Sequence, residues 1–366
     1  MNRSDSNLVV VIMAGGVGTR FWPLSTKTRP KQFLRLFGER SLLQSSYDRV
    51  RDLVPPDRVL VLTNEAFVGA VREQLPEIPQ ENIIGEPMRR DTAAAVTLAA
   101  VLCRNRFGNP VMAILTADHM IEPVSVFQET LLSAVRGARR EKGLYTFGIT
   151  PTYPATGYGY LERGEKTAED NGIEHFQLLR FKEKPDRPTA RSYLESGRFY
   201  WNSGMFVWET EVILGALREH LPDHVERVTE ACEHDGTGGW ATALHRAFEP
   251  LPRVSVDFGV MEKAESVYCV ASRFSWDDVG GWLSLRKYLE NDKTGNCCYG
   301  KIVTLDSANN ITFCEDPRDV VALVGVEDLV VVRSKNATLV VHKDRTEEIK
   351  RLVEEMEDAD YPSKAK

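Results

Sequence analysis

The chain has 366 residues, of which 42% are hydrophobic and 27% are charged, and its formal net charge is -7 at pH 7. This is the composition of a soluble globular protein with room for one large and one small domain. The negative charge argues against binding to nucleic acid or to acidic membranes, so an anionic substrate must be held by local cations and backbone amides.

No targeting or membrane-spanning segment is expected. The apolar run at residues 8–13 is far too short to cross a bilayer. The six cysteines lack C-x-x-C spacing, which favours reduced thiols over a disulfide framework or a zinc site. A cytoplasmic location is therefore expected.

Three short aliphatic runs predict buried strands at residues 8–13, 59–62 and 111–115. The Ala-rich stretch 91–102, which opens on an Asp or Thr cap, predicts a helix between the last two. Strand, helix and strand in this order predict right-handed βαβ units. We therefore expect an α/β fold with a Rossmann-like, mainly parallel sheet, helices on both faces, and ligands beyond the carboxyl ends of the strands.

The pattern changes near Asn291. Five short β runs follow at 301–305, 311–314, 320–324, 329–332 and 337–341, and a charged helix over about 346–357 closes the chain. We expect a catalytic domain at 1–290 and a small C-terminal all-β, left-handed β-helix-like domain with its terminal helix at 291–366. The apolar β runs also suggest a homodimer.

The first predicted strand leads directly into Ala14-Gly15-Gly16-Val17-Gly18-Thr19-Arg20. Glycines let the backbone approach a ligand and turn its N–H groups outward, which suits phosphates. The loop is neither a P-loop nor a dinucleotide fingerprint, whose third glycine would stand at Phe21. By itself it fits a structural turn equally well. Two prolines stiffen the segment up to Lys31, so we expect Arg20 and Lys31 to converge on one anion.

The strings 15–25 and 29–34 resemble the signature of the sugar-nucleotide pyrophosphorylases. Their Phe21-Trp22 and Lys31-Gln32-Phe33 variants look like those of the guanylyltransferases that use mannose 1-phosphate. The resemblance implies GTP and mannose 1-phosphate as substrates. It also implies that the loop holds the triphosphate, that Arg20 steadies the pyrophosphate and that Lys31 contacts phosphates.

Residues 85–94 are similar to the family's base-recognition stretch, although Asp91 and Ala94 replace its usual Asn and Pro. Guanine needs acceptors for N1–H and N2–H, which a carboxylate supplies. In the alternative interpretation, Glu86 only caps a loop and Asp91 only starts a helix. The resemblance implies a nucleotide-binding set of Ala14, Gly15, Gly16, Gly18, Thr19, Arg20, Lys31, Glu86, Pro87, Asp91, Thr92, Ala93 and Asp118.

Asp118 follows the strand predicted at 111–115. An aspartate there is often a helix cap, but Mg²⁺ beside a triphosphate also takes one or two carboxylates. The resemblance, and not sequence spacing, implies Asp278 as the second Mg²⁺ ligand. The adjacent His119 is expected to be structural.

Three further segments, 156–160, 181–185 and 200–206, resemble the family's sugar-phosphate pocket, although an isolated Glu183-Lys184 would by default be a surface ion pair. The residues implied there are Gly157, Tyr158, Gly159, Glu183, Lys184 and Asn202. A sugar phosphate is already ionised at neutral pH, so catalysis needs positioning and charge neutralisation and no general base. The catalytic set implied by the resemblance is Arg20, Lys31, Asp118 and Asp278.

Several alternatives remain at this stage. The same chemistry on a heptose or glucose 1-phosphate is one, and a catalytically silent nucleotide-sugar-binding regulator is another. The presence of all four catalytic candidates speaks against the regulator. An additional fructose 6-phosphate isomerase site would need several histidines, yet after residue 245 only His342 remains.

Overall fold

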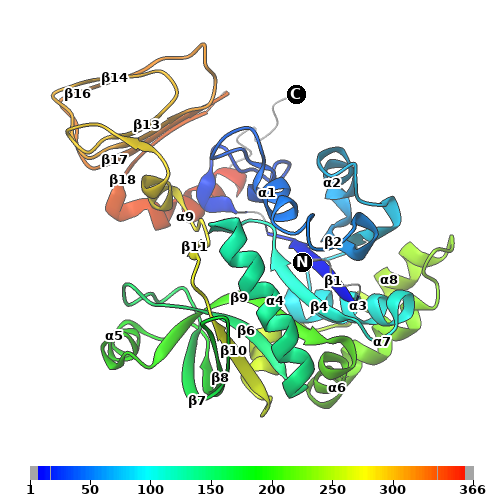
Figure 1. Ribbon diagram of the computed structural model, residues 1–366. Coiled ribbons are helices and arrows are strands. Elements are labelled where there is room, and N and C mark those ends of the chain that lie inside the picture. The colour runs from blue at the N-terminus through cyan, green and yellow to red at the C-terminus, as the bar shows by residue number, and fades with distance from the viewer. Residues whose placement is uncertain (1–6, 17, 336, 359–366) are drawn as a thin grey trace. The chain divides into compact units, whose positions relative to one another are not determined.

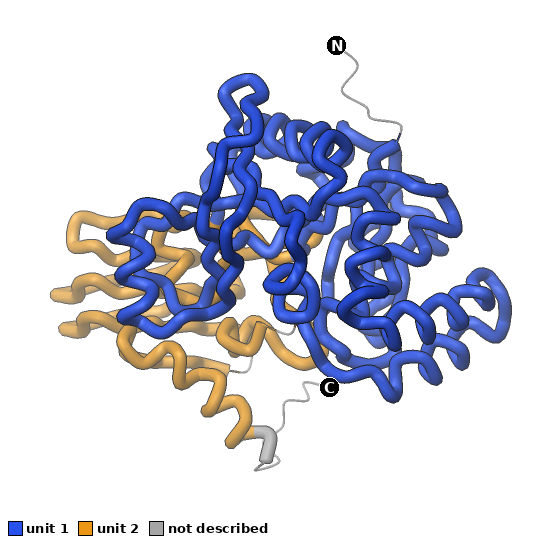
Figure 2. The backbone as a smooth tube through the Cα atoms, turned by 90° about the horizontal axis from the view of Figure 1, so that it is seen from below, with its two compact units in different colours: residues 1–15, 44–117, 121–276 blue, residues 16–43, 118–120, 277–366 orange. Residues whose placement is uncertain are grey.

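The computed structural model describes residues 7–16, 18–335 and 337–358. The chain divides into two compact units (Figure 2). Unit 1 comprises Met1–Gly15, Gln44–Ala117 and Ile121–Trp276, and unit 2 comprises Gly16–Leu43, Asp118–Met120 and Asp277–Lys366. Val17 of the glycine loop lies outside the described residues. The same holds for residues 1–6 of the predicted catalytic domain and for residues 336 and 359–366 of the predicted β domain. The boundary expected between 290 and 291 stays a prediction.

Unit 1 is built on nine strands (Figure 1), which are β1 (Leu8–Ala14), β2 (Val59–Asn64), β3 (Ile83–Glu86), β4 (Val111–Thr116), β6 (Leu144–Ile149), β7 (Tyr160–Asp170), β8 (Ile173–Lys182), β9 (Phe199–Glu209) and β10 (Val267–Ala271). Their order in the sheet is β3-β2-β1-β4-β9-β6-β10-β8-β7. The strands β1 to β4 are parallel to one another, and so is the pair β6 and β10. The antiparallel pairs of this sheet each include β7, β8 or β9. The predicted α/β class is confirmed, and the three predicted strands are β1, β2 and β4.

The helices of this part of the chain are α1 (Leu42–Asp48), α2 (Val68–Gln74), α3 (Asp91–Phe107), α4 (Val124–Glu141), α5 (Arg187–Ser196), α6 (Thr210–His220), α7 (Pro222–Cys232) and α8 (Trp240–Phe248). Both faces of β1 are buried: Val9 and Val11 belong to the core that includes α3, and Val10 and Ile12, which point to the opposite face, are equally inaccessible. An apolar run without alternation is typical of a parallel strand covered on both faces.

Helix α3 extends the predicted helix by about one turn and ends at Gly108, whose φ is 80°. Its alanines are buried against the sheet and the neighbouring helices, where only small side chains allow close approach. The expected Asp or Thr cap is absent at the N-cap position, which is Arg90. None of the helices in the described part of the chain combines the length and apolarity that a membrane crossing needs.

Unit 2 contains a five-stranded sheet of order β12-β13-β15-β17-β18 and a parallel pair of β14 and β16. These strands are β12 (Glu290–Asn291), β13 (Cys297–Tyr299), β14 (Ile302–Leu305), β15 (Ile311–Cys314), β16 (Val321–Val324), β17 (Leu329–Ser334) and β18 (Ala337–His342). The five predicted β runs are therefore confirmed as β14 to β18. A 3-10 turn (Lys343–Glu348) leads into the closing helix α9 (Ile349–Asp358). Two short strands, β5 (Met120–Glu122) and β11 (Ser275–Asp277), pair separately.

The core of unit 2 joins segments from both ends of the chain. The rings of Phe21 and Trp282 lie 5.2 Å apart, and the indole N–H of Trp282 donates to the main-chain oxygen of Trp22 at 3.1 Å. Both rings share a buried cluster with Ile311 and Val330 from neighbouring parallel strands. The segment that carries Arg20 and Lys31 is therefore packed against the residues around Asp278.

Candidate active site

Lys31 begins a 3-10 turn (Lys31–Phe33) directly after Pro30, and its side chain is only 8% exposed. Its ammonium donates to Oδ2 of Asp118 at 3.0 Å and to the main-chain oxygen of Asp278 at 2.6 Å. Because a buried ammonium without partners is costly, these two acceptors fix the position of Lys31. The structure thus brings together three of the four predicted catalytic residues.

Asp118 lies just beyond β4, as the sequence predicts. Burial by itself raises the pKa of Asp118, but the charges of Lys31 and His119 and the hydrogen bonds to the carboxylate outweigh burial, so the pKa lies below its ordinary value. Asp118 is therefore a carboxylate at neutral pH. Nε2 of His119 lies 3.9 Å from Oδ1 of Asp118.

Two glycines leave room for the side chains of Lys31 and Asp278. Gly18 has a φ of +68°, and a Cβ there would lie 2.3 Å from Cβ of Lys31. A Cβ on Gly280 would lie 3.0 Å from Oδ2 of Asp278. The glycine loop therefore positions Lys31 by close packing, which the sequence analysis did not predict.

Arg20 lies in the turn Thr19–Phe21 and pairs with Glu347, with 2.9 Å between Nε and Oε2. The two side chains are 48% and 77% exposed. Exposed ion pairs contribute little free energy, so Glu347 holds Arg20 only weakly. The convergence of Arg20 and Lys31 on one anion stays a prediction.

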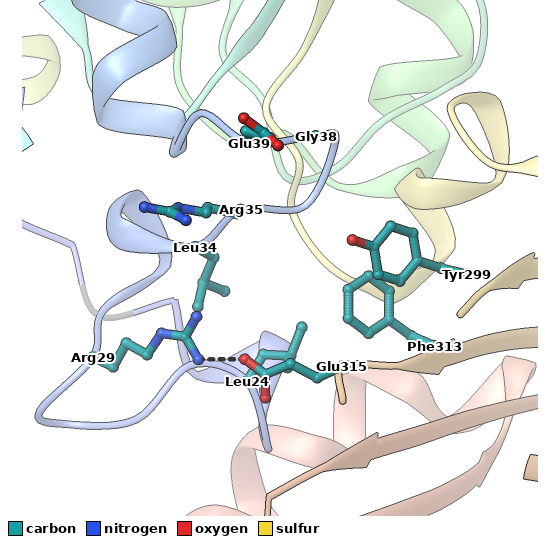
Figure 3. Close-up of a pocket in the computed structure, with 9 residues that line it drawn as sticks. All are labelled: Leu24, Arg29, Leu34, Arg35, Gly38, Glu39, Tyr299, Phe313 and Glu315. Carbon is teal, nitrogen blue, oxygen red and sulfur yellow. Dashed lines mark hydrogen bonds and ion pairs between the residues drawn. The ribbon is translucent and has the colours of Figure 1, made fainter. Parts of the chain in front are cut away.

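Arg29, close to Lys31 in the sequence, ties its segment to the C-terminal strands. Its guanidinium donates to Glu315 at 2.6 Å (Figure 3). Both residues line a pocket of about 260 Å³, in which the ring of Tyr299 stacks on that of Phe313 with centroids 4.4 Å apart. Arg29 therefore has a structural role, and this pocket does not include Lys31.

Glu86 ends β3 in unit 1. Burial raises the pKa of Glu86 to about 8. A Cβ added to Gly15 would lie 3.9 Å from Oε2 of Glu86, so the first loop glycine adjoins this carboxyl group. The hydroxyl of Thr63 holds the end of β1 by donating to the main-chain oxygen of Ala14 at 2.9 Å. Two predicted nucleotide-binding segments therefore lie side by side.

The start of α3 is fixed by a second segment of unit 1. Oδ1 of Asp91, which has a φ of 64°, accepts from the main-chain N–H of Thr92 at 2.8 Å. The hydroxyl of Thr92 accepts from the N–H of Val256 at 2.9 Å, and the N–H of Ala93 donates to the oxygen of Val254 at 3.1 Å. Residues 254–256 therefore support the predicted base-recognition stretch, a contact that sequence reasoning missed.

Glu183 and Lys184 form an ion pair of 2.8 Å in which Lys184 is 59% exposed and Glu183 only 9%. The other carboxylate oxygen of Glu183 is buried without a hydrogen-bond partner among the described residues. A Cβ on residue 159 would lie 2.3 Å from that oxygen, so a glycine at this position leaves room for the Glu183 carboxylate. A buried acceptor of this kind is available to a ligand hydroxyl.

Asn202 lies in β9 beside this pair, and its main-chain N–H donates to the oxygen of Gly159 at 2.8 Å. Its side-chain N–H donates to Asp257 at 2.9 Å. Burial and the nearby charge of Glu183 raise the pKa of Asp257 to about 7. Tyr158, in the same predicted set, packs edge-on against Trp201 and Trp276, while a Cβ on Gly157 would meet nothing within 4 Å.

Sequence reasoning missed Asp257. It begins a π-helical turn (Asp257–Met261), a feature that is common at functional sites but has no simple sequence pattern.

Each of these clusters offers cations, acceptors or glycine-lined backbone, which are the groups that bind phosphate esters. The fold and the clusters together define an α/β enzyme that acts on phosphate esters.

The Nucleotidyl transferase family model matches residues 9–295, and the MannoseP isomerase/GMP-like beta-helix domain model matches residues 300–356. The chain belongs to the nucleotidyl transferase family. It is 40% identical over 363 residues to mannose-1-phosphate guanylyltransferase 2 of Escherichia coli O157:H7, covering 96% of this chain and 74% of that protein. It is 38% identical over 360 residues to the xanthan biosynthesis protein XanB of Xanthomonas campestris pv. campestris (strain B100), covering 97% and 74%.

A solved structure described as a mannose-1-phosphate geranyltransferase from Thermus thermophilus is similar along nearly the whole chain. The TM-score is 0.84 with 33% sequence identity, and the match covers 96% of this chain and 99% of that one. The fold class predicted from the sequence, including the C-terminal β-helix, is confirmed by these comparisons.

Proposed function

We propose that this protein transfers GMP from GTP to α-D-mannose 1-phosphate, giving GDP-mannose and pyrophosphate. The relatives that carry the name mannose-1-phosphate guanylyltransferase support the substrates. The observation that carries the chemistry is the Lys31 ammonium, held by Asp118 and the main-chain oxygen of Asp278. A cation fixed in this way neutralises charge without reorganising during the reaction.

In the proposed reaction, a phosphate oxygen of mannose 1-phosphate attacks the α-phosphorus of GTP in line. The new bond joins that oxygen to the α-phosphorus, and the bond to the α–β bridging oxygen breaks, so the electron pair leaves with pyrophosphate. Lys31 neutralises charge in the transition state, and Arg20 with the loop amides of Gly16, Gly18 and Thr19 holds the departing phosphates. Ala14, Gly15, Glu86, Pro87, Asp91, Thr92 and Ala93 bind the nucleoside portion.

The sugar phosphate is bound by a separate set of side chains. Lys184 is more than half exposed and offers its ammonium to the phosphate. The buried oxygen of Glu183 accepts from a sugar hydroxyl, and Asn202, Gly157, Tyr158 and Gly159 complete the set. This division of roles follows from the chemistry of each side chain.

We propose Mg²⁺ as the cofactor, with Asp118 and Asp278 as its protein ligands. The residues fit this ion, because Asp118 is ionised at neutral pH and Mg²⁺ uses one or two carboxylates with phosphates and water. Among the described residues no group of three or more His, Cys, Asp or Glu side chains is arranged to hold a metal ion. When bound, Mg²⁺ supplies positive charge to the α-phosphate.

One assay panel tests the proposal. Four nucleoside triphosphates are combined with mannose, glucose and heptose 1-phosphates, and pyrophosphate release is measured. We expect the highest kcat/KM for GTP with mannose 1-phosphate. A preference for another sugar phosphate would support the alternative substrates, and no turnover with any pair would support a regulator.

We further propose that residues 1–290 act as the catalytic domain and 291–366 as the small β domain, and that the protein is a cytoplasmic homodimer. All six cysteines are free thiols, which suits a reducing compartment. Val303, Leu305 and Val324 on β14 and β16 are 58–64% exposed, and apolar surface of this kind suits a second copy. Light scattering at micromolar concentration tests the dimer.

A further inference from the structure

The orientation of the Asn202 side chain is fixed by three hydrogen bonds. Its Oδ1 accepts from the hydroxyl of Thr146 at 3.0 Å and from the main-chain N–H of Gly204 at 3.2 Å. Its Nδ2 donates to Oδ1 of Asp257 at 2.9 Å. An amide oxygen has two lone pairs and an amide nitrogen two hydrogens. The main-chain N–H of Gly204 therefore marks the oxygen of the Asn202 amide and Asp257 marks its nitrogen, and one N–H of the amide remains.

Thr146 is itself held in place. Its hydroxyl lies 3.0 Å from the main-chain oxygen of Met205 as well, so its single hydrogen is shared between two acceptors on β9. Thr146 is fully buried, and Asn202 is only 8% exposed. The network around the amide is therefore held from several sides, and Asp257 is its acidic member.

We propose that Asp257 is a positioning residue that makes Asn202 a pure hydrogen-bond donor toward the sugar, while Glu183 is the acceptor. This inference rests on the proposed function. Without the carboxylate, the Asn202 amide loses the acceptor that holds its nitrogen, and its orientation rests on the weaker contact with the Gly204 N–H. A site with one fixed donor and one fixed acceptor distinguishes sugar hydroxyls by their orientation.

The surroundings of Asp257 suit this role. Besides burial, the charge of Glu183 raises the pKa of Asp257 and the charge of Lys184 lowers it. Burial lowers the pKa of Lys184, but Glu183 and Asp257 raise it by more. The main-chain N–H of Glu183 donates to Oε1 of Glu262 at 2.9 Å, one residue after the π-helical turn that Asp257 begins. The same turn therefore positions both the donor Asn202 and the acceptor Glu183.

Substitution of Asp257 tests the proposal. Asp257→Ala removes the acceptor, and Asp257→Asn keeps an oxygen that accepts from Asn202. At pH 8, above the pKa of about 7 that burial gives Asp257, we expect Asp257→Ala to raise KM for mannose 1-phosphate by roughly tenfold to a hundredfold, the loss typical of a charge-assisted hydrogen bond. KM for GTP is expected to change less than about twofold. Asp257→Asn restores most of the affinity. The preference for mannose over glucose 1-phosphate falls in Asp257→Ala.

The matched control is Asp235→Ala, which removes a carboxylate that pairs with Arg106 at 2.8 Å and lies outside the proposed sugar-binding set. It is expected to leave both KM values unchanged. The inference would be overturned if Asp257→Ala and Asp257→Asn raised KM for mannose 1-phosphate and KM for GTP equally. It would also be overturned if neither variant changed either KM value. Failure of the wild-type protein to use mannose 1-phosphate with GTP would instead contradict the proposed function.

Discussion

The ammonium of Lys31 lies 3.0 Å from the carboxylate of Asp118, although the two residues are 87 positions apart in the chain. The same ammonium bonds the main-chain oxygen of Asp278, which lies 247 positions from Lys31. Because the ammonium has three N–H groups, these two contacts leave one donor for a ligand. This remaining donor is the one that the proposed mechanism directs to a phosphate of the substrate.

Lys31→Ala is expected to lower kcat by about 10²–10³-fold, as for the loss of a fixed donor to developing charge. The measurement is steady-state pyrophosphate release at saturating substrates. Lys142→Ala is the control, because Lys142 makes a comparable ion pair of 2.7 Å with Glu209 outside the proposed site. An unchanged kcat in Lys31→Ala would remove Lys31 from the mechanism.

Gly18→Ala is expected to reduce kcat nearly as much, because the added Cβ would lie 2.3 Å from Cβ of Lys31. The positive φ also strains the variant, at a cost of about 1–3 kcal/mol in the free energy of unfolding. Gly197→Ala separates the two effects: Gly197 has a φ of +63°, and a Cβ there would meet nothing within 4 Å. It should lose stability and keep its activity. Equal activity of both variants would show that Gly18 does not position Lys31.

The affinity for GTP is expected to rise with pH through about 8. Burial raises the pKa of Glu86 to about 8, so below that pH its carboxyl group is protonated and accepts poorly from guanine N–H groups. KM for GTP, measured from pH 6 to pH 9, should fall with rising pH in the wild type, and the part of this slope due to Glu86 should vanish in Glu86→Gln. Identical slopes in the two proteins would place Glu86 away from the base.

Asp257→Asn is expected to stabilise the protein while it keeps most of the affinity for the sugar phosphate. Because the pKa of Asp257 is raised to about 7 from 3.8, protonation favours the folded state. This contribution is complete below the unfolded value and is lost as pH rises through about 7. The variant should therefore melt at least about 2 °C above the wild type at pH 8, the smallest shift that 1 kcal/mol gives a domain of about 250 residues. The difference should shrink at pH 5. A lower melting temperature at pH 8 would contradict the burial of this charge.

Much of this fold was accessible from local patterns. Apolar runs identified β1, β2 and β4 because parallel strands covered on both faces carry no polar alternation. Asp118 was found because ligands gather beyond the carboxyl ends of such strands. The five β runs of the C-terminal part were found for similar reasons.

Contacts between distant segments were not accessible in this way. No local pattern predicts that Arg20 pairs with Glu347, or that Gly18 packs on Lys31, because both depend on how the chain folds back on itself. Asp257 was missed because its proposed role rests on a hydrogen bond to Asn202 from a segment without periodicity. The proposed sharing of Mg²⁺ by Asp118 and Asp278 rests on family resemblance for the same reason.

The most direct test of the proposed chemistry follows the oxygen between the α- and β-phosphorus atoms of GTP. The wild-type protein is incubated with Mg²⁺, mannose 1-phosphate and GTP that carries ¹⁸O at this bridge, and the products are separated and analysed by mass spectrometry. Attack at the α-phosphorus predicts that all of the label leaves in pyrophosphate and that GDP-mannose is unlabelled. Label retained in GDP-mannose, or no GDP-mannose at all, would contradict the account.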